Sequence, residues 1–294
     1  MKDVLLRGLV RPADLRLILV EATDLSRMAR MLHGLAPTSA SIFAEAMTAG
    51  LLLGALQKGE TRVNLSLEVD GPLSGLLVDA GTDGSVRGHV RRPDVHFPGD
   101  PAIGPCAALG GSGTLSVLRD LGKGEFYRGS VEVLPGTLTD NLRRYFAASE
   151  QVATAIDIRV LPTGKEPLGM VAGLVVQKMP EGSVDALETA RNRIAGGAFL
   201  DALASGAKDE ALARSVVGDG LEVLTRGPVS YVCNCSRQRA VNAASALGHA
   251  GIREVLAEEK QVVIDCEFCK KRYVIEEAEL SDIARRLEGD LPAC

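Results

Sequence analysis

Stretches with the two-residue period of a β-strand and stretches with the spacing of an amphipathic helix share the first 180 residues of the chain. Residues 15–21 are rich in β-prone side chains, and residues 23–35 then carry apolar residues at helical intervals. A second helix is predicted over residues 39–57, which are rich in Ala, Leu and Met. A third is predicted over residues 138–148.

Short apolar runs separated by glycine-bearing turns follow the second helix. They predict strands at Val63–Val69, Leu76–Asp79, Val86–Val90, Thr114–Arg119, Ser130–Leu134, Ala155–Val160 and Met170–Gln177. Strands in runs, with helices grouped between them, are typical of an α+β fold with a largely antiparallel sheet. We therefore expect residues 1–180 to form a mixed α/β core domain.

A change of pattern marks the end of this domain at Pro180-Glu181-Gly182. Residues 181–227 keep an approximate helical spacing, with Ser183 as a possible N-cap, but glycines interrupt it repeatedly. Each glycine in a helix costs about 1 kcal/mol relative to alanine. This segment is predicted to be a metastable helical linker whose helices depend on docking.

The remaining residues, 228–294, predict a small domain of short elements. A short helix is expected after Ser236, ending near Gly248, and another over residues 252–259. A hairpin and a terminal helix from about Glu277 follow. So few large apolar side chains give a thin core, which a metal ion commonly stabilises in domains of this size.

Composition narrows the class of protein. The chain has 294 residues, of which 46% are hydrophobic and 24% charged, with a net charge of −5. This balance argues against a nucleic acid or an anionic membrane as partner. Arg7 and Arg11 interrupt the apolar residues near the N-terminus, so no secretory signal is predicted. A cytoplasmic location, where thiols stay reduced, is expected.

Four of the six cysteines form two close pairs, Cys233-Asn234-Cys235 and Cys266-Glu267-Phe268-Cys269. Soft sulfur ligands in tetrahedral geometry select zinc or iron–sulfur clusters, and we expect one Zn²⁺ per chain. Four protein ligands leave no coordination position for substrate, so no catalytic residue is predicted. Independent cysteines, or two disulfides of a secreted domain, fit less well because such scaffolds are rich in cysteine.

Three other side chains near this chemistry are expected to be non-ligands. They are Cys106 in the core domain, Cys294 at the C-terminus, and His249 between the two pairs.

Two roles for the zinc remain open from the residues alone. It can be an inert structural ion, which is the usual role of a four-cysteine site. It can also be a redox switch, because zinc keeps its ligands as thiolates, the form that oxidants attack. Oxidation would then remove ligands and unfold the domain that the metal stabilises.

Beyond the cysteines, the whole chain resembles the bacterial redox-regulated chaperones of the heat shock protein 33 family. The residues that carry the resemblance are Leu15–Thr23, Asp70–Leu73, Val86–Gly88, Tyr145, Ser149–Gln151, Gly173–Pro180, the two cysteine pairs and Ser236-Arg237.

This resemblance implies a holdase chaperone that is inactive when reduced and zinc-bound, and that works without ATP. On oxidation, the disulfides Cys233–Cys235 and Cys266–Cys269 would form, zinc would be released, and the zinc-binding domain would unfold. The linker would then lose its docking and expose a surface that holds unfolding client proteins. The resemblance also implies a monomer when reduced, a homodimer when activated, and no enzymatic activity.

Two other functions fit part of the sequence. One is a zinc-ribbon adaptor that binds a protein or RNA partner, with purely structural cysteines. The other is a thiol oxidoreductase that uses Cys266 and Cys269 catalytically, against which stands the absence of a thioredoxin-like βαβ pattern around that pair.

Overall fold

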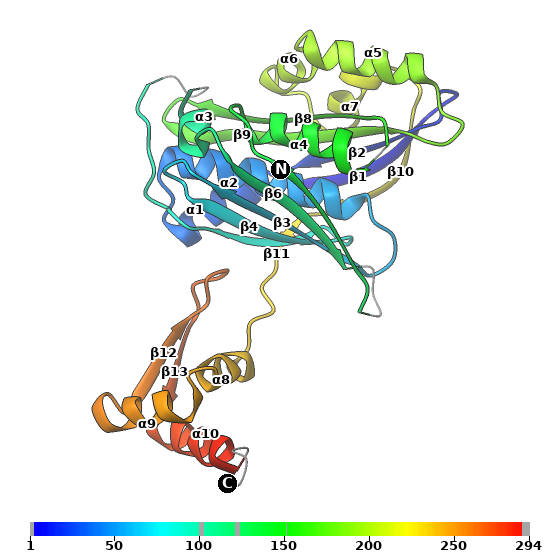
Figure 1. Cartoon of the computed structure of the whole chain (residues 1–294). Helices are drawn as coiled ribbons and strands as arrows, with labels where there is room; N and C mark the ends of the chain where they lie inside the picture. The colour runs from blue at the N-terminus through cyan, green and yellow to red at the C-terminus, as the bar shows by residue number, and fades with distance from the viewer. Residues whose placement is uncertain (1–2, 100–102, 121–123, 151, 290–294) are drawn as a thin grey trace. The chain divides into compact units, whose positions relative to one another are not determined.

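The computed structural model describes residues 3–99, 103–120, 124–150 and 152–289 (Figure 1). The chain divides into two compact units, residues 1–232 and residues 233–294. Two largely antiparallel sheets and the helices around them form the first unit. The second unit combines three helices with a two-stranded hairpin. This architecture confirms the α+β class and the largely antiparallel sheets.

The first sheet has five strands in the order β10-β1-β2-β9-β8, and every neighbouring pair is antiparallel. Its strands are β1 (Val4–Val10), β2 (Leu15–Glu21), β8 (Thr154–Thr163), β9 (Glu166–Lys178) and β10 (Leu221–Pro228). β1 and β10 were not predicted as strands. They pair with each other from opposite ends of the first unit, a long-range contact that no local pattern reveals.

The second sheet has six strands in the order β11-β5-β4-β3-β6-β7. Its strands are β3 (Arg62–Val69), β4 (Gly75–Gly81), β5 (Ser85–Val90), β6 (Gly113–Asp120), β7 (Phe126–Glu132) and β11 (Ser230–Tyr231). The predicted strands at β3 to β6 are confirmed, whereas β7 begins and ends earlier than predicted. β11 lies parallel to β5, and the other pairs are antiparallel.

Helix α2 (Pro37–Ala55) forms the centre of the first unit and packs against strands of both sheets (Figure 1). Its close approach to β4 requires glycine, because a Cβ on Gly50 would lie 2.6 Å from Val78 Cγ1. Of the described helices, α2 is the one long and apolar enough to cross a membrane, but 94% of that stretch is buried inside the protein. Its hydropathy therefore reflects its place in the core. The neighbouring helices are α1 (Thr23–His33), α3 (Ile103–Leu109) and α4 (Leu138–Tyr145), which a π-helical turn, η1 (Phe146–Glu150), extends.

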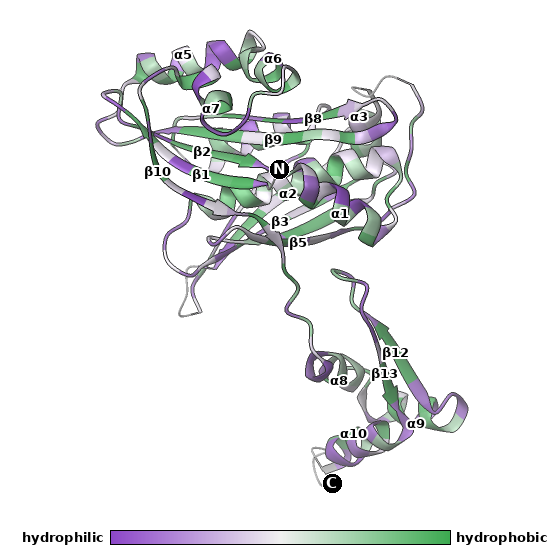
Figure 2. Ribbon diagram, turned by 180° about the vertical axis from the view of Figure 1, so that it is seen from behind, coloured by the Kyte–Doolittle hydropathy of each residue, from purple (hydrophilic) through white to green (hydrophobic). Residues whose placement is uncertain are grey.

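Three short helices cover the other face of the five-stranded sheet: α5 (Val184–Ala195), α6 (Ala198–Ala204) and α7 (Asp209–Val217). Figure 2 shows them stacked over β1, β2, β8 and β9. The Ser183 side chain caps α5 as predicted, accepting a hydrogen bond from the Ala186 amide at 3.1 Å. α5 ends before Gly196, and Gly197 has a φ of 88°, which explains the break before α6.

The prediction that residues 181–227 form only marginal helices is wrong for their last part. The three helices end at Val217, and strand β10 follows. Leu187 of α5, Phe199 of α6 and Leu212 of α7 are buried against side chains of the sheet. Docking on this apolar face supplies the stability that such short helices lack on their own.

Strand β11 anchors the last residues of the first unit. The Tyr231 hydroxyl donates a hydrogen bond to the Gly88 carbonyl at 2.9 Å and accepts one from the Gly88 amide at 3.3 Å. His33 Nε2 lies 2.9 Å from the Tyr231 hydroxyl oxygen. The amides of Ser230 and Val232 bond to carbonyls on either side of Ser85. The chain is therefore fixed to β5 up to the residue before Cys233.

The second unit contains α8 (Arg237–Ser245), α9 (Gly248–Glu258), the hairpin of β12 (Gln261–Asp265) and β13 (Arg272–Glu276), and α10 (Glu277–Gly289). Ser236 caps α8, and α9 begins earlier than predicted, at Gly248. Its core is small. The buried apolar residues of this unit are Ala240, Val241, Ala244, Ile252, Tyr273, Ile275, Leu280 and Ile283.

The carboxyl group of Glu45 is buried in the core of the first unit. Glu45 on α2 is 8% exposed, and its Oε1 accepts hydrogen bonds from the amide and the hydroxyl of Thr139, at 2.8 and 2.5 Å. Thr139 lies in the first turn of α4, so Glu45 joins the two helices. Burial raises the pKa of Glu45 to about 7, and the charges of Asp140 and Asp157 act in the same direction.

The wild-type protein is expected to lose stability as the pH rises, and replacing Glu45 by Gln is expected to remove this loss. The model-compound pKa is 4.5, whereas in the folded protein the carboxyl stays protonated until about pH 7. The folded state is therefore progressively destabilised as the pH rises through this window. At about 1.4 kcal/mol for each pKa unit, the loss is about 3 kcal/mol. Urea unfolding of both proteins across this pH range measures it.

The exposed carboxylate of Glu68 offers a matched control for this experiment. Glu68→Gln should follow the wild-type pH dependence, whereas Glu45→Gln should match the wild type at about pH 4.5 and exceed it at about pH 8. If the free energy of unfolding of all three proteins changed with pH in the same way, the protonation of Glu45 would make no contribution to stability.

Candidate metal centre

Two separate segments bring the four predicted cysteines together. Cys233 and Cys235 lie in the extended segment between β11 and α8, where residues two apart present side chains to one side. Cys266 and Cys269 lie in the turn of the β12–β13 hairpin, as the sequence predicted. The turn is closed by backbone hydrogen bonds from Cys266 N to Lys271 O and from Lys270 N to Cys266 O, at 2.9 and 2.7 Å.

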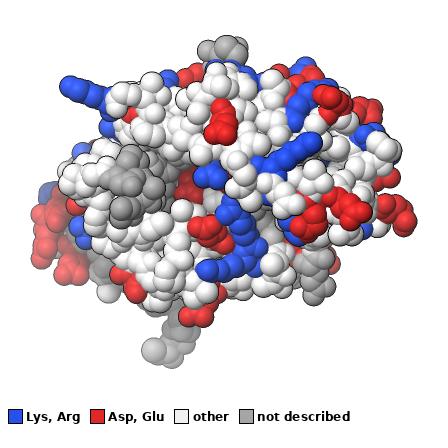
Figure 3. Space-filling view, turned by 90° about the horizontal axis from the view of Figure 1, so that it is seen from above, with Lys and Arg blue, Asp and Glu red and all other residues white. Residues whose placement is uncertain are grey.

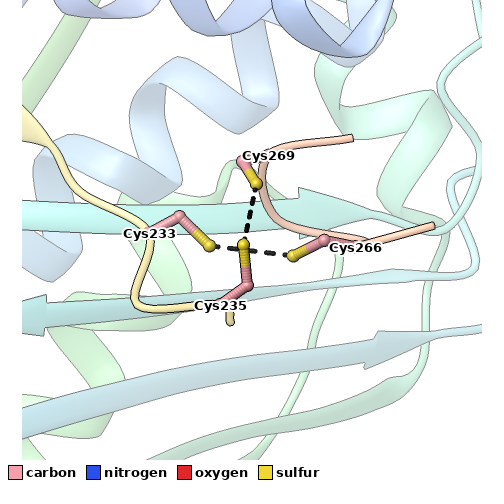
Figure 4. A group of neighbouring side chains, drawn as sticks. All are labelled: Cys233, Cys235, Cys266 and Cys269. Atoms are coloured by element: carbon pink, nitrogen blue, oxygen red, sulfur yellow. Dashed lines mark hydrogen bonds between the residues drawn. The ribbon is translucent and has the colours of Figure 1, made fainter. Parts of the chain in front are cut away.

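The sulfur atoms converge on one point (Figure 4). All four lie within 4.8 Å of one another, and all four side chains are half-buried. The separation is 3.7 Å between Cys233 and Cys266 and 3.3 Å between Cys235 and Cys269. A tetrahedral ion about 2.3 Å from each sulfur would place the sulfurs about 3.8 Å apart. The cluster can therefore hold a metal ion with small adjustments.

Three thiols of the cluster, those of Cys233, Cys235 and Cys269, have different electrostatic environments. A hydrogen bond from Tyr273 lowers the pKa of Cys235 to about 7. Burial raises the pKa of Cys269 to about 12, and burial also raises the pKa of Cys233. Of these three thiols, Cys235 therefore loses its proton most readily, and a metal ion must displace the protons of Cys233 and Cys269.

Tyr273 is the functional residue that the sequence reasoning missed. Its ring is buried in the core of the second unit, and its hydroxyl donates a hydrogen bond to Cys235 Sγ at 3.1 Å. The Lys271 ammonium lies over the ring, 5.2 Å from its centroid. Tyr273 and Ile275 alternate with exposed residues on β13, which is the signal that places the tyrosine on the inner face of the hairpin.

Ion pairs flank the turn that carries the second cysteine pair. Lys270 Nζ lies 2.8 Å from Glu267, and Arg272 binds Asp265 with two nitrogens, each at 2.8 Å. Exposed pairs of this kind contribute about 0–1 kcal/mol.

The predicted non-ligands take no part in the cluster. Cys106 lies on α3 in the first unit, where burial raises the pKa of its thiol. His249 lies in the first turn of α9, outside the group of sulfurs. Cys294 is outside the described residues.

Comparison with known proteins gives one consistent result. A family model described as "Hsp33 protein" matches residues 3–276. The chain is 32% identical to the 33 kDa chaperonin of Geobacillus kaustophilus, with 96% of this chain and 98% of the relative covered. Identity is 33% to the 33 kDa chaperonin of Gloeobacter violaceus, with 99% and 98% covered.

A solved structure shares the fold. The crystal structure of the 33 kDa chaperonin (heat shock protein 33 homolog) from Thermotoga maritima superimposes with a TM-score of 0.88. The alignment covers 99% of this chain and 100% of that one, at 24% sequence identity.

Replacing Tyr273 by Phe is expected to weaken metal binding. The hydrogen bond to Cys235 orients this sulfur, and losing such a contact to a ligand typically costs about 10–100-fold in metal affinity. Competition with a chromophoric zinc chelator measures the change. Tyr231→Phe, which removes a hydroxyl that hydrogen-bonds to Gly88 within the first unit, is the control, and equal affinities of the two variants would contradict the role of Tyr273.

Proposed function

The chain belongs to the Hsp33 family of chaperones, and from that premise we propose that it is an ATP-independent holdase controlled by oxidation of its four clustered cysteines. In this proposal the reduced, zinc-bound protein is inactive. Oxidation forms two disulfides, releases zinc and unfolds part of the chain, which then prevents the aggregation of unfolding proteins. The observation that carries the proposal is the convergence of four sulfurs in a unit with a small core.

Zinc is the metal we propose for the cluster, one ion per chain, held by Cys233, Cys235, Cys266 and Cys269. Four thiolates favour zinc, and a closed shell of four protein ligands gives it a structural role without catalysis. When bound, the ion supplies crosslinking between the segment before α8 and the β12–β13 turn. In zinc-finger peptides, such binding is worth about 10–16 kcal/mol, which is folding free energy.

The proposed disulfides join neighbouring cysteines, Cys233 with Cys235 and Cys266 with Cys269. In the structure, however, the closest sulfurs belong to opposite pairs, such as Cys233 and Cys266, which are 33 positions apart. A disulfide across the pairs would close a long loop and keep the unit constrained, at roughly 3–4 kcal/mol. Disulfides within the pairs constrain little, so they leave the unit free to unfold once the zinc has gone.

We propose that residues 1–180 form the core domain, residues 181–227 the linker and residues 228–294 the zinc-binding domain. Helices α5 to α7 of the linker cover an apolar face of the five-stranded sheet. If they undock, buried side chains of the sheet become exposed, among them Leu17, Leu19 and Leu174. Such a surface fits unfolding client proteins, whose exposed apolar segments need cover from water.

Neither nucleic acid nor membrane is a proposed partner. The net charge is −5, and basic and acidic side chains alternate over the face seen in Figure 3. We propose a cytoplasmic protein that is monomeric when reduced and dimeric when activated.

Peroxide at raised temperature tests the proposal on the zinc-loaded protein. We expect one zinc ion released per chain, four thiols lost, and suppression of client aggregation only after these changes. Metal release, free thiols and light scattering from a denatured client are followed together, and peptide mapping identifies the disulfides. A purely structural zinc site would keep its metal, and equal suppression by reduced and oxidised protein would refute redox control.

Phe199→Ala tests the part played by the linker helices. The side chain of Phe199, a residue of α6, is fully buried in the core that the linker helices form with the sheet. Its truncation costs about 3–5 kcal/mol of stability. The variant should therefore suppress aggregation at a lower peroxide concentration or temperature than the wild type. Val184→Ala, at a side chain 58% exposed on α5, should behave as wild type. An unchanged threshold in Phe199→Ala would argue against control by docking.

A further inference from the structure

A cavity of about 710 Å³ lies along β8 in the first unit, between η1 and helix α5. Its volume falls within the range of about 300–1,000 Å³ that is usual for ligand sites. Apolar side chains from all three elements line it, including Phe146, Ile156 and Ile194. Three arginines also line it, Arg143, Arg159 and Arg191, and no acidic residue does. We call this cavity the β8 groove.

The β8 groove follows an edge of the five-stranded sheet. The Ala153 carbonyl accepts a hydrogen bond from the Lys178 amide, which places alternate residues of β8 toward β9. The backbone groups of Thr154, Ile156 and Ile158 therefore face the groove. Among the described residues, no further strand pairs with this edge. An unpaired edge is a template on which an extended segment can form hydrogen bonds.

Two arginines donate hydrogen bonds to backbone carbonyl groups of this edge. Arg191 of α5 donates to the Thr154 carbonyl from Nε and Nη2, at 3.3 and 3.0 Å. Arg143 of α4 donates from Nε to the Ile156 carbonyl at 3.2 Å. Each guanidinium stands where the N–H group of an added strand would bind.

Positive charge remains available in the groove. The buried carboxylate of Asp157 forms ion pairs with both Arg143 and Arg159, at 2.9 and 2.7 Å. Arg159 has no other hydrogen-bond partner among the described residues. Asp140 and Glu188 pair with the outer nitrogens of Arg143 and Arg191, at 2.7 and 2.5 Å, but neither lines the groove. Arginine binds carboxylates with two parallel hydrogen bonds, so an anion is the complementary ligand.

We propose that the edge of β8 is a docking site for an extended apolar segment that carries carboxylates, and that Arg143 and Arg191 hold this site closed. On docking, amides of the segment take the carbonyls of Thr154 and Ile156, and its carboxylates bind Arg159 and the displaced guanidinium of Arg143. Apolar side chains of the segment enter the groove. This mode of binding is strand addition, with specificity from the side-chain pockets.

The inference rests on the proposed function in one respect, namely that the segment belongs to an unfolding client. Arg191 then links the site to activation, because it lies on α5 within the proposed linker. When α5 undocks, the guanidinium leaves the Thr154 carbonyl and the edge becomes free, while the apolar side chains of η1 and β8, such as Phe146 and Ile156, remain to contact the segment. The groove itself is a property of the first unit and does not depend on the cysteines.

Arg191→Ala tests the site in the reduced, zinc-loaded protein, without oxidant. The probe is a fluorescent peptide of alternating valine and glutamate, with binding followed by anisotropy. Because the variant removes a competing hydrogen-bond donor, we expect about tenfold tighter binding than in the wild type. Arg193→Ala is the control, since Arg193 lies on the same helix but donates to the Val216 carbonyl at 3.1 Å. Arg191→Lys should give an intermediate affinity.

Two further measurements report on the mode of binding. The bound peptide should protect the amides of Ile156 and Ile158 from hydrogen exchange, and N-methylation of alternate peptide amides should abolish binding. A valine–lysine peptide should bind weakly. Equal gains in Arg191→Ala and Arg193→Ala, unprotected amides, or equal binding of the lysine peptide would overturn the proposal. None of these outcomes depends on redox control, so the peroxide experiment stands or fails separately.

Discussion

The meeting of four cysteine sulfurs from two distant segments is the constraint on which the C-terminal unit depends. Only a small group of apolar side chains is buried there, several of them alanine or valine. A core of this size supplies little free energy against the conformational entropy of the chain. The sulfur cluster lies at one end of the hairpin and joins it to the segment before α8, so its loss would remove this long-range contact.

The first unit is organised in the opposite way. Helix α2 is buried along nearly its whole length, and its residues form one continuous core with strands of both sheets. The helices α5 to α7 form a separate core on the outer face of the five-stranded sheet. Two cores of this kind allow the outer layer to change while the inner one stays folded. In the function proposed above, part of the chain unfolds, and this separation would keep the rest of the protein folded.

Local patterns predicted much of the structure. The spacing of apolar residues located α1, α2 and most strands of the six-stranded sheet, because each of these elements has a regular buried face. The cysteine spacing located the metal centre, because both pairs are local in sequence. β1 and β10 were missed, since each becomes a strand through pairing with a partner at the other end of the unit.

The contacts made by individual side chains were beyond sequence reasoning. Tyr273 reads as an ordinary inward residue of a strand, and only the fold shows that its hydroxyl reaches Cys235. Arg143 and Arg191 resemble solvated helix residues, yet they bind carbonyls of β8. The disulfide pairing and the domain boundaries stay predictions, because they concern a second state of the molecule.

The anchor at Tyr231 has a consequence for how disorder travels along the chain. Between the cysteine-bearing unit and the short helices of residues 184–217 lie two strands, of which β11 is fixed to β5 by its backbone and by the Tyr231 hydroxyl. Unfolding that starts in the C-terminal unit therefore reaches the hydrogen bonds of β11 at Tyr231, two residues before Cys233, and these bonds resist its spread. Several hydrogen bonds must break together for unfolding to spread past β11. This requirement sets a thermal threshold between unfolding of the C-terminal unit and exposure of the five-stranded sheet. In the function proposed above, such a threshold would make the protein respond to oxidation and heat together and not to either one alone.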